Sequence, residues 1–234
     1  MLITVYRYNH EDDFSYKMQE YNIDVSKCNG VMLLDALIYI KDNLDESLTF
    51  RRSCGEGVCG SDAMNINGVN GLACITPLNK FNDKVVLRPL PGMPVIRDLV
   101  VDMTAFYNHY RRIKPFLQND ESVSYNAEML QSKDDRKKLD GLYECILCAS
   151  CSSFCPSYWW NPDRFLGPAA ALQALRFVND SRDNKTVERL SYLDDKYNIF
   201  SCRSIRNCMY VCPKGLDPSK AIAELRIKML NNNI

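Results

Sequence analysis

The pattern of hydrophobic and polar positions divides the chain near residue 100. Before that point, short apolar segments are bounded by Gly, Asn and Pro, which is typical of strands. Among them, Leu33, Leu37, Ile40 and Leu44 recur at helical spacing, so the segment 31–43 is expected to be an amphipathic helix. The predicted strands are 2–8, 14–21, 48–52, 62–66 and 85–90, the first two forming a hairpin.

After a proline-rich turn at 88–94, the spacing becomes helical. Pro168 and the pair Asp217-Pro218 stand where helices usually begin. The polar segment 117–140 is expected to be an exposed connection with little core of its own. The predicted helices are 98–110, 167–180, 184–197 and 217–230.

Length and composition agree with this division. A chain of 234 residues can build two cores, and we expect an α+β protein with domains at 1–103 and 104–234. Equal numbers of basic and acidic residues, 29 of each, disfavour a protein that binds nucleic acid. The first residues lack the regions of a secretory signal, and no apolar run is long enough for a membrane span. We therefore expect a soluble or peripheral protein in a reducing compartment.

Eleven cysteines are the unusual feature of the composition. Their odd number and the missing secretory signal argue against a disulfide framework and favour metal or iron–sulfur ligation, because thiolates are strong, soft ligands. Ten of them fall into three groups. The eleventh, Cys28, precedes the first predicted helix and is interpreted as a small buried hydrophobe.

The first group comprises Cys54, Cys59, Asp62 and Cys74. Its spacing matches plant-type [2Fe–2S] sites, with Asp62 where the third thiolate would stand. The glycines between these residues allow the backbone to wrap closely round a small anionic cluster. Two alternatives remain open. In the first alternative, Asp62 only caps a turn, and Ser61 or water completes the site. In the second, the group binds zinc, although zinc usually prefers paired Cys-x-x-Cys elbows.

The second group lies in the run CILCASCSSFCP and comprises Cys145, Cys148, Cys151 and Cys155, followed by Pro156. It repeats without a gap the bacterial ferredoxin pattern, in which three thiolates bind one cluster and the fourth binds another. The alternative, a zinc site, has little use for four such crowded cysteines.

The third group, in SCRSIRNCMYVCP, supplies the partner of that run. It has three cysteines, Cys202, Cys208 and Cys212, and Ile205 stands at the position of the missing one. Isoleucine cannot hold a fourth iron, although a labile iron bound by water is an alternative. Counting thiolates therefore predicts a [4Fe–4S] cluster on Cys145, Cys148, Cys151 and Cys212 and a [3Fe–4S] cluster on Cys155, Cys202 and Cys208.

Outside these groups the chain offers little reaction chemistry. His10 and His109 are the only histidines, and each is interpreted as a surface or core residue. No Gly-x-Gly-x-x-Gly motif indicates a bound dinucleotide. Three clusters without a catalytic base or nucleophile predict an electron carrier that depends on a flavin in another subunit.

In their order and flanking sequence, the three motifs resemble those of the iron–sulfur subunits of succinate dehydrogenase, respiratory complex II. The resemblance covers nearly the whole chain. It implies an N-terminal plant-type ferredoxin β-grasp domain and an all-helical, bacterial-ferredoxin-like domain. It also implies a flavoprotein partner whose FAD oxidises succinate in the tricarboxylic acid cycle, and membrane anchor subunits with haem b of a cytochrome b556 type. Electrons would pass from FAD through the [2Fe–2S], [4Fe–4S] and [3Fe–4S] clusters to ubiquinone.

The same resemblance implies a quinone site. Trp160 corresponds to a tryptophan that hydrogen-bonds the quinone in the family, with Pro156, Ser157 and Ile205 nearby. Arg203 stands where many relatives have histidine; it can donate hydrogen bonds but cannot shuttle a proton near neutral pH. The alternative is that the aromatic residues only cover a subunit interface.

Two other functions compete with succinate oxidation. Quinol:fumarate reductase would run the same relay backwards, and Asp62 with its surrounding sequence favours the succinate-oxidising direction. A free-standing multicluster ferredoxin would leave its tryptophans in solvent, which a stable monomer avoids. The expected location is the cytoplasmic side of the bacterial inner membrane, or the matrix side of the mitochondrial inner membrane for a mature eukaryotic form.

Overall fold

The computed structural model describes residues 1–11, 15–120, 128–195 and 197–232. Contacts between Cα atoms divide the chain into two compact units. The sheet unit comprises residues 1–103 together with 146–154, and the helical unit comprises 104–145 and 155–234. The short segment 146–154, which carries two of the clustered cysteines, is thus grouped with the sheet.

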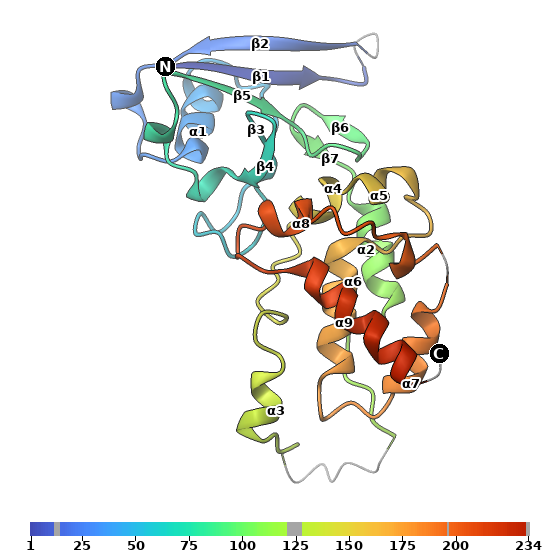
Figure 1. Cartoon of the computed structure of the whole chain (residues 1–234). Coiled ribbons are helices and arrows are strands. Elements are labelled where there is room, and N and C mark those ends of the chain that lie inside the picture. Colours follow the sequence, from blue (N-terminus) through green and yellow to red (C-terminus); the bar gives the residue numbers. More distant parts are fainter. Residues whose placement is uncertain (12–14, 121–127, 196, 233–234) are drawn as a thin grey trace. The chain divides into compact units, whose positions relative to one another are not determined.

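A mixed five-stranded sheet forms the frame of the sheet unit (Figure 1). Its spatial order is β2-β1-β5-β3-β4, with β1 and β5 parallel and the other neighbours antiparallel. The strands are β1 (Leu2–Tyr8), β2 (Tyr16–Asn22), β3 (Ala63–Ile66), β4 (Val69–Leu72) and β5 (Lys84–Arg88), and a separate pair is formed by β6 (Val95–Arg97) and β7 (Val100–Val101). Three short 3₁₀ turns connect them: Val25–Lys27, Ala73–Ile75 and Leu78–Lys80.

The helix predicted over 31–43 is confirmed as α1 (Leu33–Asn43). The Asp35 side chain accepts a hydrogen bond from the Met32 backbone N–H, which satisfies a donor at the helix start. The helix buries Leu37 and Ile40 against the alternate strand positions Ile3 and Val5, all of which are fully buried. Apolar residues that repeat every 3.6 positions along the helix and every two positions along the strand thus pack into one core.

The prediction of a strand at 48–52 is wrong. Leu48 is fully buried, as the pattern suggested. The backbone of the next residue, Thr49, forms hydrogen bonds with a side chain and with a loop rather than with a strand. The Thr49 backbone N–H donates to Asp98 Oδ2 at 2.8 Å, and its carbonyl accepts from the Leu99 N–H at 3.3 Å. The Asp98 carboxylate therefore replaces the neighbouring strand that a ladder needs.

Two further elements differ from expectation at their ends. The helix predicted over 98–110 is α2 (Thr104–Arg112), because Asp98 bonds to the loop at Thr49 and residues 100–101 form β7. The second predicted strand is found as β2, whereas its predicted first residue, 14, lies outside the described residues. The pattern missed β4, a four-residue strand whose sequence VNGL has no clear alternation.

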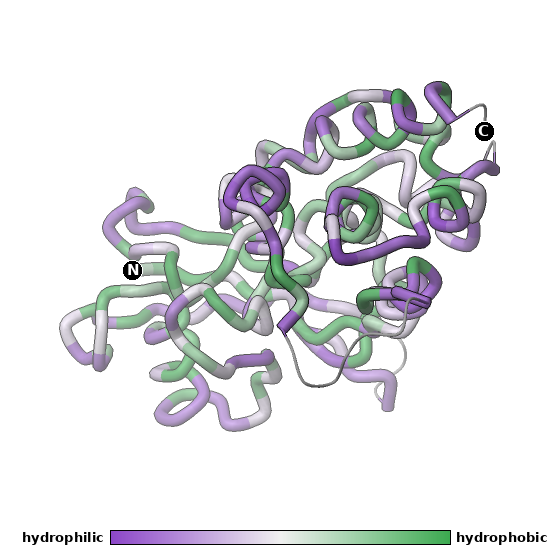
Figure 2. The backbone as a smooth tube through the Cα atoms, turned by 90° about the horizontal axis from the view of Figure 1, so that it is seen from below, coloured by the Kyte–Doolittle hydropathy of each residue, from purple (hydrophilic) through white to green (hydrophobic). Residues whose placement is uncertain are grey.

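The helical unit is built round α6 (Gly167–Val178), in which all but one residue is buried. It packs against α2, α7 (Thr186–Leu193) and α9 (Pro218–Asn231), so the three predicted C-terminal helices are confirmed. In Figure 2 the helix leading to the C-terminus alternates between hydrophobic and hydrophilic colours, as expected for a helix with one buried face. The short helices are α3 (Lys133–Lys137), α5 (Pro156–Trp160), α8 (Asn207–Tyr210) and the 3₁₀ turn Ile199–Ser201; α4 (Ser150–Ser153) belongs to the sheet unit.

A buried ion pair fixes the loop before α7. Arg189 Nη2 donates to Asp183 Oδ2 at 2.7 Å, and both side chains are almost completely buried. The guanidinium also donates to the carbonyls of Ile113, Lys114 and Phe116. A buried charge pair with its remaining hydrogen bonds satisfied specifies one loop geometry.

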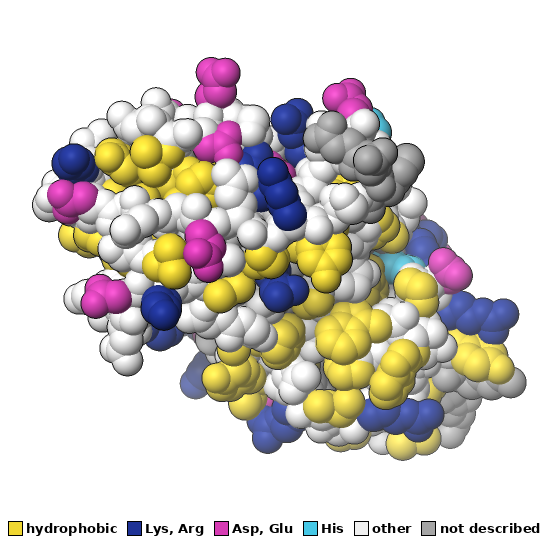
Figure 3. All heavy atoms as spheres, turned by 90° about the horizontal axis from the view of Figure 1, so that it is seen from above, with side chains coloured by type: hydrophobic (Ala, Val, Ile, Leu, Met, Phe, Trp, Pro, Cys, Tyr) yellow, Lys and Arg dark blue, Asp and Glu magenta, His cyan; other side chains and the backbone are white. Residues whose placement is uncertain are grey.

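The described part of the chain contains no helix that is both long and apolar enough to cross a membrane. On the face drawn in Figure 3, hydrophobic side chains gather in patches, and the basic side chains are separated by other residues. Within each unit, the described side chains drawn on this face thus form no continuous basic surface of the kind that phosphate backbones bind.

Candidate metal centres

The loop that follows the segment 48–52 gathers backbone N–H groups round a cysteine sulfur. Cys54 Sγ accepts from the N–H groups of Glu56, Val58 and Cys59 at 3.3, 3.4 and 3.3 Å. Gly55 has φ +73°, a left-handed conformation that glycine adopts without steric cost. This concave arrangement of N–H groups favours a negatively charged occupant.

The second cysteine of the loop is stabilised as a thiolate. Cys59 Sγ accepts from the Cys54 N–H at 3.5 Å and lies 3.1 Å from Ser61 Oγ. Burial raises the pKa of Cys59, but the hydrogen bonds from Ser61 and Cys54 outweigh it and lower the pKa to about 6. Cys54 and Cys59 are both exposed, so the open side of the site lies here.

The other two candidates of the first group form the buried side of the site. Asp62 is 2% exposed and Cys74 is 4% exposed, and the Cys74 N–H donates to Asp62 Oδ2 at 2.5 Å. Burial and the adjacent carboxylate raise the pKa of Cys74 to about 12, while an N–H bond from Gly57 opposes them. Ionising the Cys74 thiol next to the Asp62 carboxyl therefore needs a compensating cation, so these side chains fit a cluster that contains iron.

The second and third cysteine groups, the runs 145–156 and 202–213, share a backbone pattern. In the first run Leu147 and Ala149 have φ of 54° and 64°, and in the second Ser204 and Arg206 have φ of 56° and 68°. Each pair flanks the second ligand position, which is Cys148 in one run and Ile205 in the other. None of the four is glycine, so their left-handed conformations are unusual and mark the same folded loop twice.

Three cysteines of the helical unit surround one pocket. Cys155, Cys202 and Cys208 line it, and so do four predicted quinone-site residues, Pro156, Ser157, Arg203 and Ile205. The remaining lining residues are Pro168, Ser204, Arg206, Asn207 and Ser219.

Burial makes two of these thiols, Cys208 and Cys155, costly to ionise. It raises the pKa of Cys208 to about 12, and the negative charges of Cys155 and Cys202 add to the effect. Burial likewise raises the pKa of Cys155, against backbone N–H bonds from Tyr158 and Ser157. Negative charge on the buried Cys208 and the half-buried Cys155 is therefore stable only beside bound cations, and the donor set of the pocket fits an iron–sulfur cluster with three thiolate ligands.

The predicted four-thiolate set is divided between the two units. Cys148 and Cys151 lie in the sheet unit, whereas Cys145 and Cys212 lie in the helical unit. Their common cluster stays a prediction from sequence spacing. All eleven cysteines are within the described residues, and none forms a disulfide.

No single-metal site competes with these groups in the part of the chain that the structure describes. There, no three His, Cys, Asp or Glu side chains are arranged to hold one metal ion. Cluster ligands bind different irons and stand farther apart than the ligands of one zinc ion.

Two tryptophans end the helix that follows Cys155. Trp159 is 41% exposed and Trp160 is 70% exposed, whereas the preceding Tyr158 is buried. Trp160 does not line the cysteine pocket, so the structure brings together only the other four residues of the predicted quinone site. Two such exposed side chains are typical of an interface or a ligand contact.

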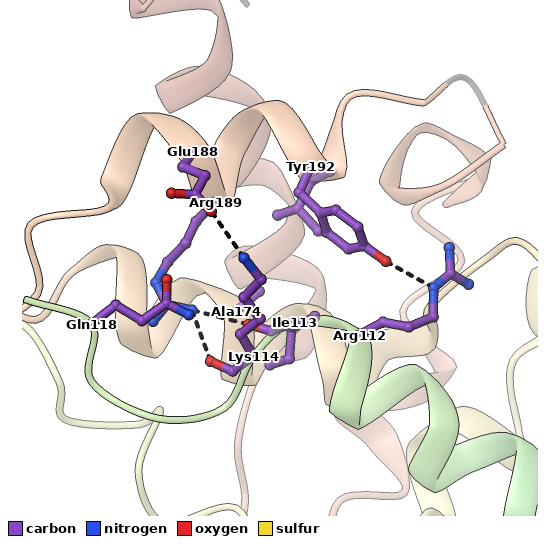
Figure 4. A pocket seen from close by; sticks show the side chains of 9 residues that line it. Arg112, Ile113, Lys114, Gln118, Ala174, Glu188, Arg189 and Tyr192 are labelled. Carbon is purple, nitrogen blue, oxygen red and sulfur yellow. Dashed lines mark hydrogen bonds and ion pairs between the residues drawn. The ribbon is translucent and has the colours of Figure 1, made fainter.

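A second pocket of the helical unit contains none of the candidates (Figure 4). Lys114 Nζ and Glu188 Oε1 form an ion pair of 2.9 Å there, and Arg112 Nε donates to the Tyr192 hydroxyl at 3.0 Å. No cysteine or histidine lines it. His109 is buried on α2, where its Nε2 lies 2.5 Å from the Pro162 carbonyl oxygen, so of the two interpretations, surface or core residue, the structure supports the second.

Sequence reasoning missed the buried polar contacts that hold the cluster loops. Asn70 Nδ2 donates to the Ser150 carbonyl at 3.0 Å and to Ser153 Oγ at 2.7 Å. Asn65 Nδ2 donates in turn to Asn70 Oδ1 at 2.9 Å. The only sequence signal was two asparagines within short strands, where this residue is usually depleted.

Comparisons with known proteins agree with the two cluster regions. Residues 2–108 match the family model described as a 2Fe-2S iron-sulfur cluster binding domain, and residues 118–217 match a 4Fe-4S dicluster domain. The chain is similar to the succinate dehydrogenase iron-sulfur subunit of Coxiella burnetii, with 54% identity over 98% of this chain and 97% of that one. It is also similar to the subunit of the same name from Paracoccus denitrificans, with 51% identity over 97% of this chain and 87% of that one.

A solved structure supports the fold. A chain of the Mycobacterium smegmatis Sdh1 complex in the apo form superposes with a TM-score of 0.88, covering 99% of this chain and 95% of that one at 24% identity. The relatives are named for succinate oxidation, so the fumarate reductase alternative is not favoured. The resemblance carried by the three cysteine motifs is confirmed, and the chain belongs to the family of succinate dehydrogenase iron–sulfur subunits, which carry electrons within a succinate dehydrogenase complex.

Proposed function

We propose that this subunit passes electrons one at a time from the FAD of a flavoprotein partner to ubiquinone. The relay consists of a [2Fe–2S], a [4Fe–4S] and a [3Fe–4S] cluster, each of which accepts and releases one electron when bound. Succinate gives up two electrons and quinone accepts two, so a chain of one-electron carriers connects two two-electron reactions.

The first cluster is held by Cys54, Cys59, Asp62 and Cys74. The N–H groups round Cys54 Sγ and the Ser61 hydroxyl beside Cys59 stabilise negative charge on the sulfurs. The strand order β2-β1-β5-β3-β4 with one crossing helix supports classification of this unit as a plant-type ferredoxin β-grasp domain.

The second and third clusters occupy the cysteine runs of a bacterial-ferredoxin-like domain. Cys145, Cys148, Cys151 and Cys212 hold four irons, and Cys155, Cys202 and Cys208 hold three. Support for the three-iron cluster comes from Ile205, which has the backbone position of a ligand, between two left-handed residues, but no electron pair to donate.

The quinone binds beside the three-cysteine pocket. Ser157 and Arg203 line that pocket and carry hydrogen-bond donors, and the exposed indole N–H of Trp160 supplies another. Pro156 and Ile205 give the pocket apolar surface. Arginine holds its proton near neutral pH, so Arg203 orients the quinone and the protons come from elsewhere, including the anchor subunits.

The proposed partners are the FAD-containing flavoprotein and two membrane anchor subunits with haem b. Exposed apolar side chains on α5 and α8, two helices that contribute residues to the pocket, support an apolar contact of the helical unit with a partner. They are Trp159, Trp160, Met209 and Tyr210, and the exposed Ile205 of the pocket wall adds to them. The complex would then hold this subunit peripherally on the cytoplasmic side of a bacterial inner membrane, or on the matrix side in a mitochondrion.

The observation that carries the proposal is the single pocket shared by Cys155, Cys202 and Cys208 with Ser157, Arg203 and Ile205. It is tested with Trp160→Phe in the whole complex, which removes the indole N–H and keeps an aromatic ring. Quinone reduction by succinate is expected to fall about ten-fold, the effect of one lost hydrogen bond, because about 1.4 kcal/mol corresponds to that factor.

Two controls make the result specific. Succinate oxidation with an artificial acceptor that takes electrons from the flavin should be unchanged, and the neighbouring Trp159→Phe should leave both assays near the parent rate. Equal losses in both assays for Trp160→Phe would show a structural role for this residue and contradict its place in the quinone site.

A further inference from the structure

Two cysteine loops of the sheet unit touch at a glycine. Gly60 follows Cys59 directly, and a β-carbon built on it would lie 2.7 Å from Cβ of Cys148 and 2.9 Å from its Cα. The same β-carbon would lie 3.1 Å from the Ile146 carbonyl oxygen. These distances are inside van der Waals contact, so only a residue without a side chain allows the two loops to approach this closely.

A buried polar clamp holds the second loop at this contact. Asn70 on β4 donates to the carbonyl of Ser150 and the hydroxyl of Ser153, which lie on both sides of Cys151 in α4. Asn70 is 4% exposed and both serines are fully buried, so these bonds form in a low dielectric and resist exchange with water. The clamp and the glycine contact therefore fix one loop against the other.

We infer that the Gly60–Cys148 contact sets the gap across which electrons pass from the [2Fe–2S] to the [4Fe–4S] cluster, and that Asn70 is a positioning residue for it. The inference rests on the proposed function, in which Cys59 and Cys148 are ligands of these two clusters. In this step one electron leaves the [2Fe–2S] cluster, which is oxidised, and reduces the [4Fe–4S] cluster. No bond is made or broken and no proton moves. Because electronic coupling falls steeply with the width of a gap, a small separation of the loops slows the step.

The loop offers a matched control for a test at Gly60. Gly55 has φ +73° and Gly60 has φ +70°, so an alanine at either position carries a similar backbone strain. A β-carbon at Gly55 meets no atom of the described residues within 4 Å, whereas one at Gly60 meets Cys148. The difference between Gly60→Ala and Gly55→Ala therefore isolates the contact from the strain.

The experiment uses the complete complex with Gly60→Ala, Gly55→Ala or Asn70→Ala, fully reduced with dithionite. The readout is the microwave power that half-saturates the EPR signal of the [2Fe–2S] cluster, because a neighbouring paramagnetic cluster speeds its relaxation. We expect Gly60→Ala and Asn70→Ala to lose part of this relaxation enhancement, while Gly55→Ala keeps the parent value. The reduction potential of the [2Fe–2S] cluster should be the same in Gly60→Ala and Gly55→Ala.

Two results would overturn the inference in different ways. Equal half-saturation power in all three variants and the parent, with both clusters present, would show that the contact does not set the gap, and the proposed function would stand. A parent complex lacking either cluster would remove the proposed function itself, and the inference with it. If Gly60→Ala fails to assemble, Asn70→Ala decides the outcome alone. This variant alters neither a ligand nor the segment 54–62, which is called the glycine loop below.

Discussion

Two candidate cluster sites, the one at the glycine loop of the sheet unit and the three-cysteine pocket of the helical unit, each have three cysteines where a complete site has four. They differ in the residue that stands at the fourth position. In the first, Asp62 stands at the missing position, 2% exposed and next to Cys74. In the second, Ile205 stands there, 49% exposed and on the wall of the pocket. One position therefore keeps an electron-pair donor of a different kind, and the other keeps none.

The difference shows which feature of a loop decides the kind of cluster. The backbone round Ile205 repeats the left-handed residues that surround Cys148, so the loop retains the form of a ligand loop. What it lacks is a donor atom. In the proposed first cluster, Asp62 would replace a sulfur donor by an oxygen donor, and a carboxylate ligand would keep a negative charge at the site. In the proposed function, the donor atoms therefore decide the type of cluster, and the backbone decides the shape of its site.

The largest expected effect is the loss of a whole cluster in Asp62→Asn. A neutral amide does not replace an anionic ligand, so the EPR signal of the reduced [2Fe–2S] cluster should disappear while the three-iron signal remains. Asp62→Cys, which restores a thiolate, should keep the cluster. An unchanged [2Fe–2S] signal in the asparagine variant would mean that Asp62 only caps the turn at Cys74.

Next in size is the conversion of one cluster into another in Ile205→Cys. A fourth thiolate at the ligand position of the pocket should retain a fourth iron, so the oxidised three-iron EPR signal should be lost and the potential of the site lowered. Ile205→Val is the control, because it changes the volume without adding a donor. Persistence of the three-iron signal in the cysteine variant would refute the assignment of Ile205 to the vacant corner.

A smaller effect is expected from the hydroxyl beside the glycine loop. Ser61 Oγ lies 3.1 Å from Cys59 Sγ, and a hydrogen bond to this sulfur stabilises the more negative, reduced cluster. Ser61→Ala should lower the reduction potential of the [2Fe–2S] cluster by about 20–40 mV, corresponding to roughly 0.5–1 kcal/mol for one electron. A redox titration followed by EPR measures the shift, and Ser61→Thr should restore the parent value. The potentials of the clusters in the cysteine runs should not move.

The smallest expected effect is a difference between the two units in how their stability responds to mildly acidic pH. Burial lowers the pKa of His109, and the nearby positive charge of Arg112 adds to it, against the bond to Pro162. The unfolded chain therefore binds a proton at His109 more readily than the folded chain does. The contribution of neutral His109 to the stability of the helical unit is thus fully present above about pH 6.5, and it falls as the pH decreases toward the pKa of the folded state. Hydrogen exchange of the peptide 104–113 should show a small loss of protection on going from pH 7 to mildly acidic pH.

The sheet unit should keep its protection over the same range. Although burial raises the pKa of Asp45, hydrogen bonds from Ser47, Tyr21 and Arg7 lower it further than burial raises it. Its stabilising charge is present above about pH 3.9, the ordinary pKa of Asp, and is lost only as the pH falls through the lower folded value. His109→Gln should abolish the loss in the helical unit, and an identical pH response in that variant would exclude His109 as its source.

The sequence predicted what is local and missed what depends on distant partners. The helix at 31–43 and the strand at 2–8 follow from hydrophobic spacing. The cysteine spacing assigned Cys155, Cys202 and Cys208 to one cluster, and the structure brings these three residues to one pocket, while the cluster itself stays a prediction. The segment 48–52 was misassigned because its partner is the Asp98 carboxylate, far away in the chain. No pattern of residue types reveals that Gly60 contacts Cys148, because that contact exists only after both loops have folded.

The most direct test of the account is EPR of the complete complex before and after succinate is added, with analysis of its iron and sulfide. The oxidised complex should show a three-iron signal, and succinate should abolish that signal while a reduced [2Fe–2S] signal appears. A complex that contains zinc in place of iron, or one whose oxidised form lacks the three-iron signal, would contradict the one-electron relay.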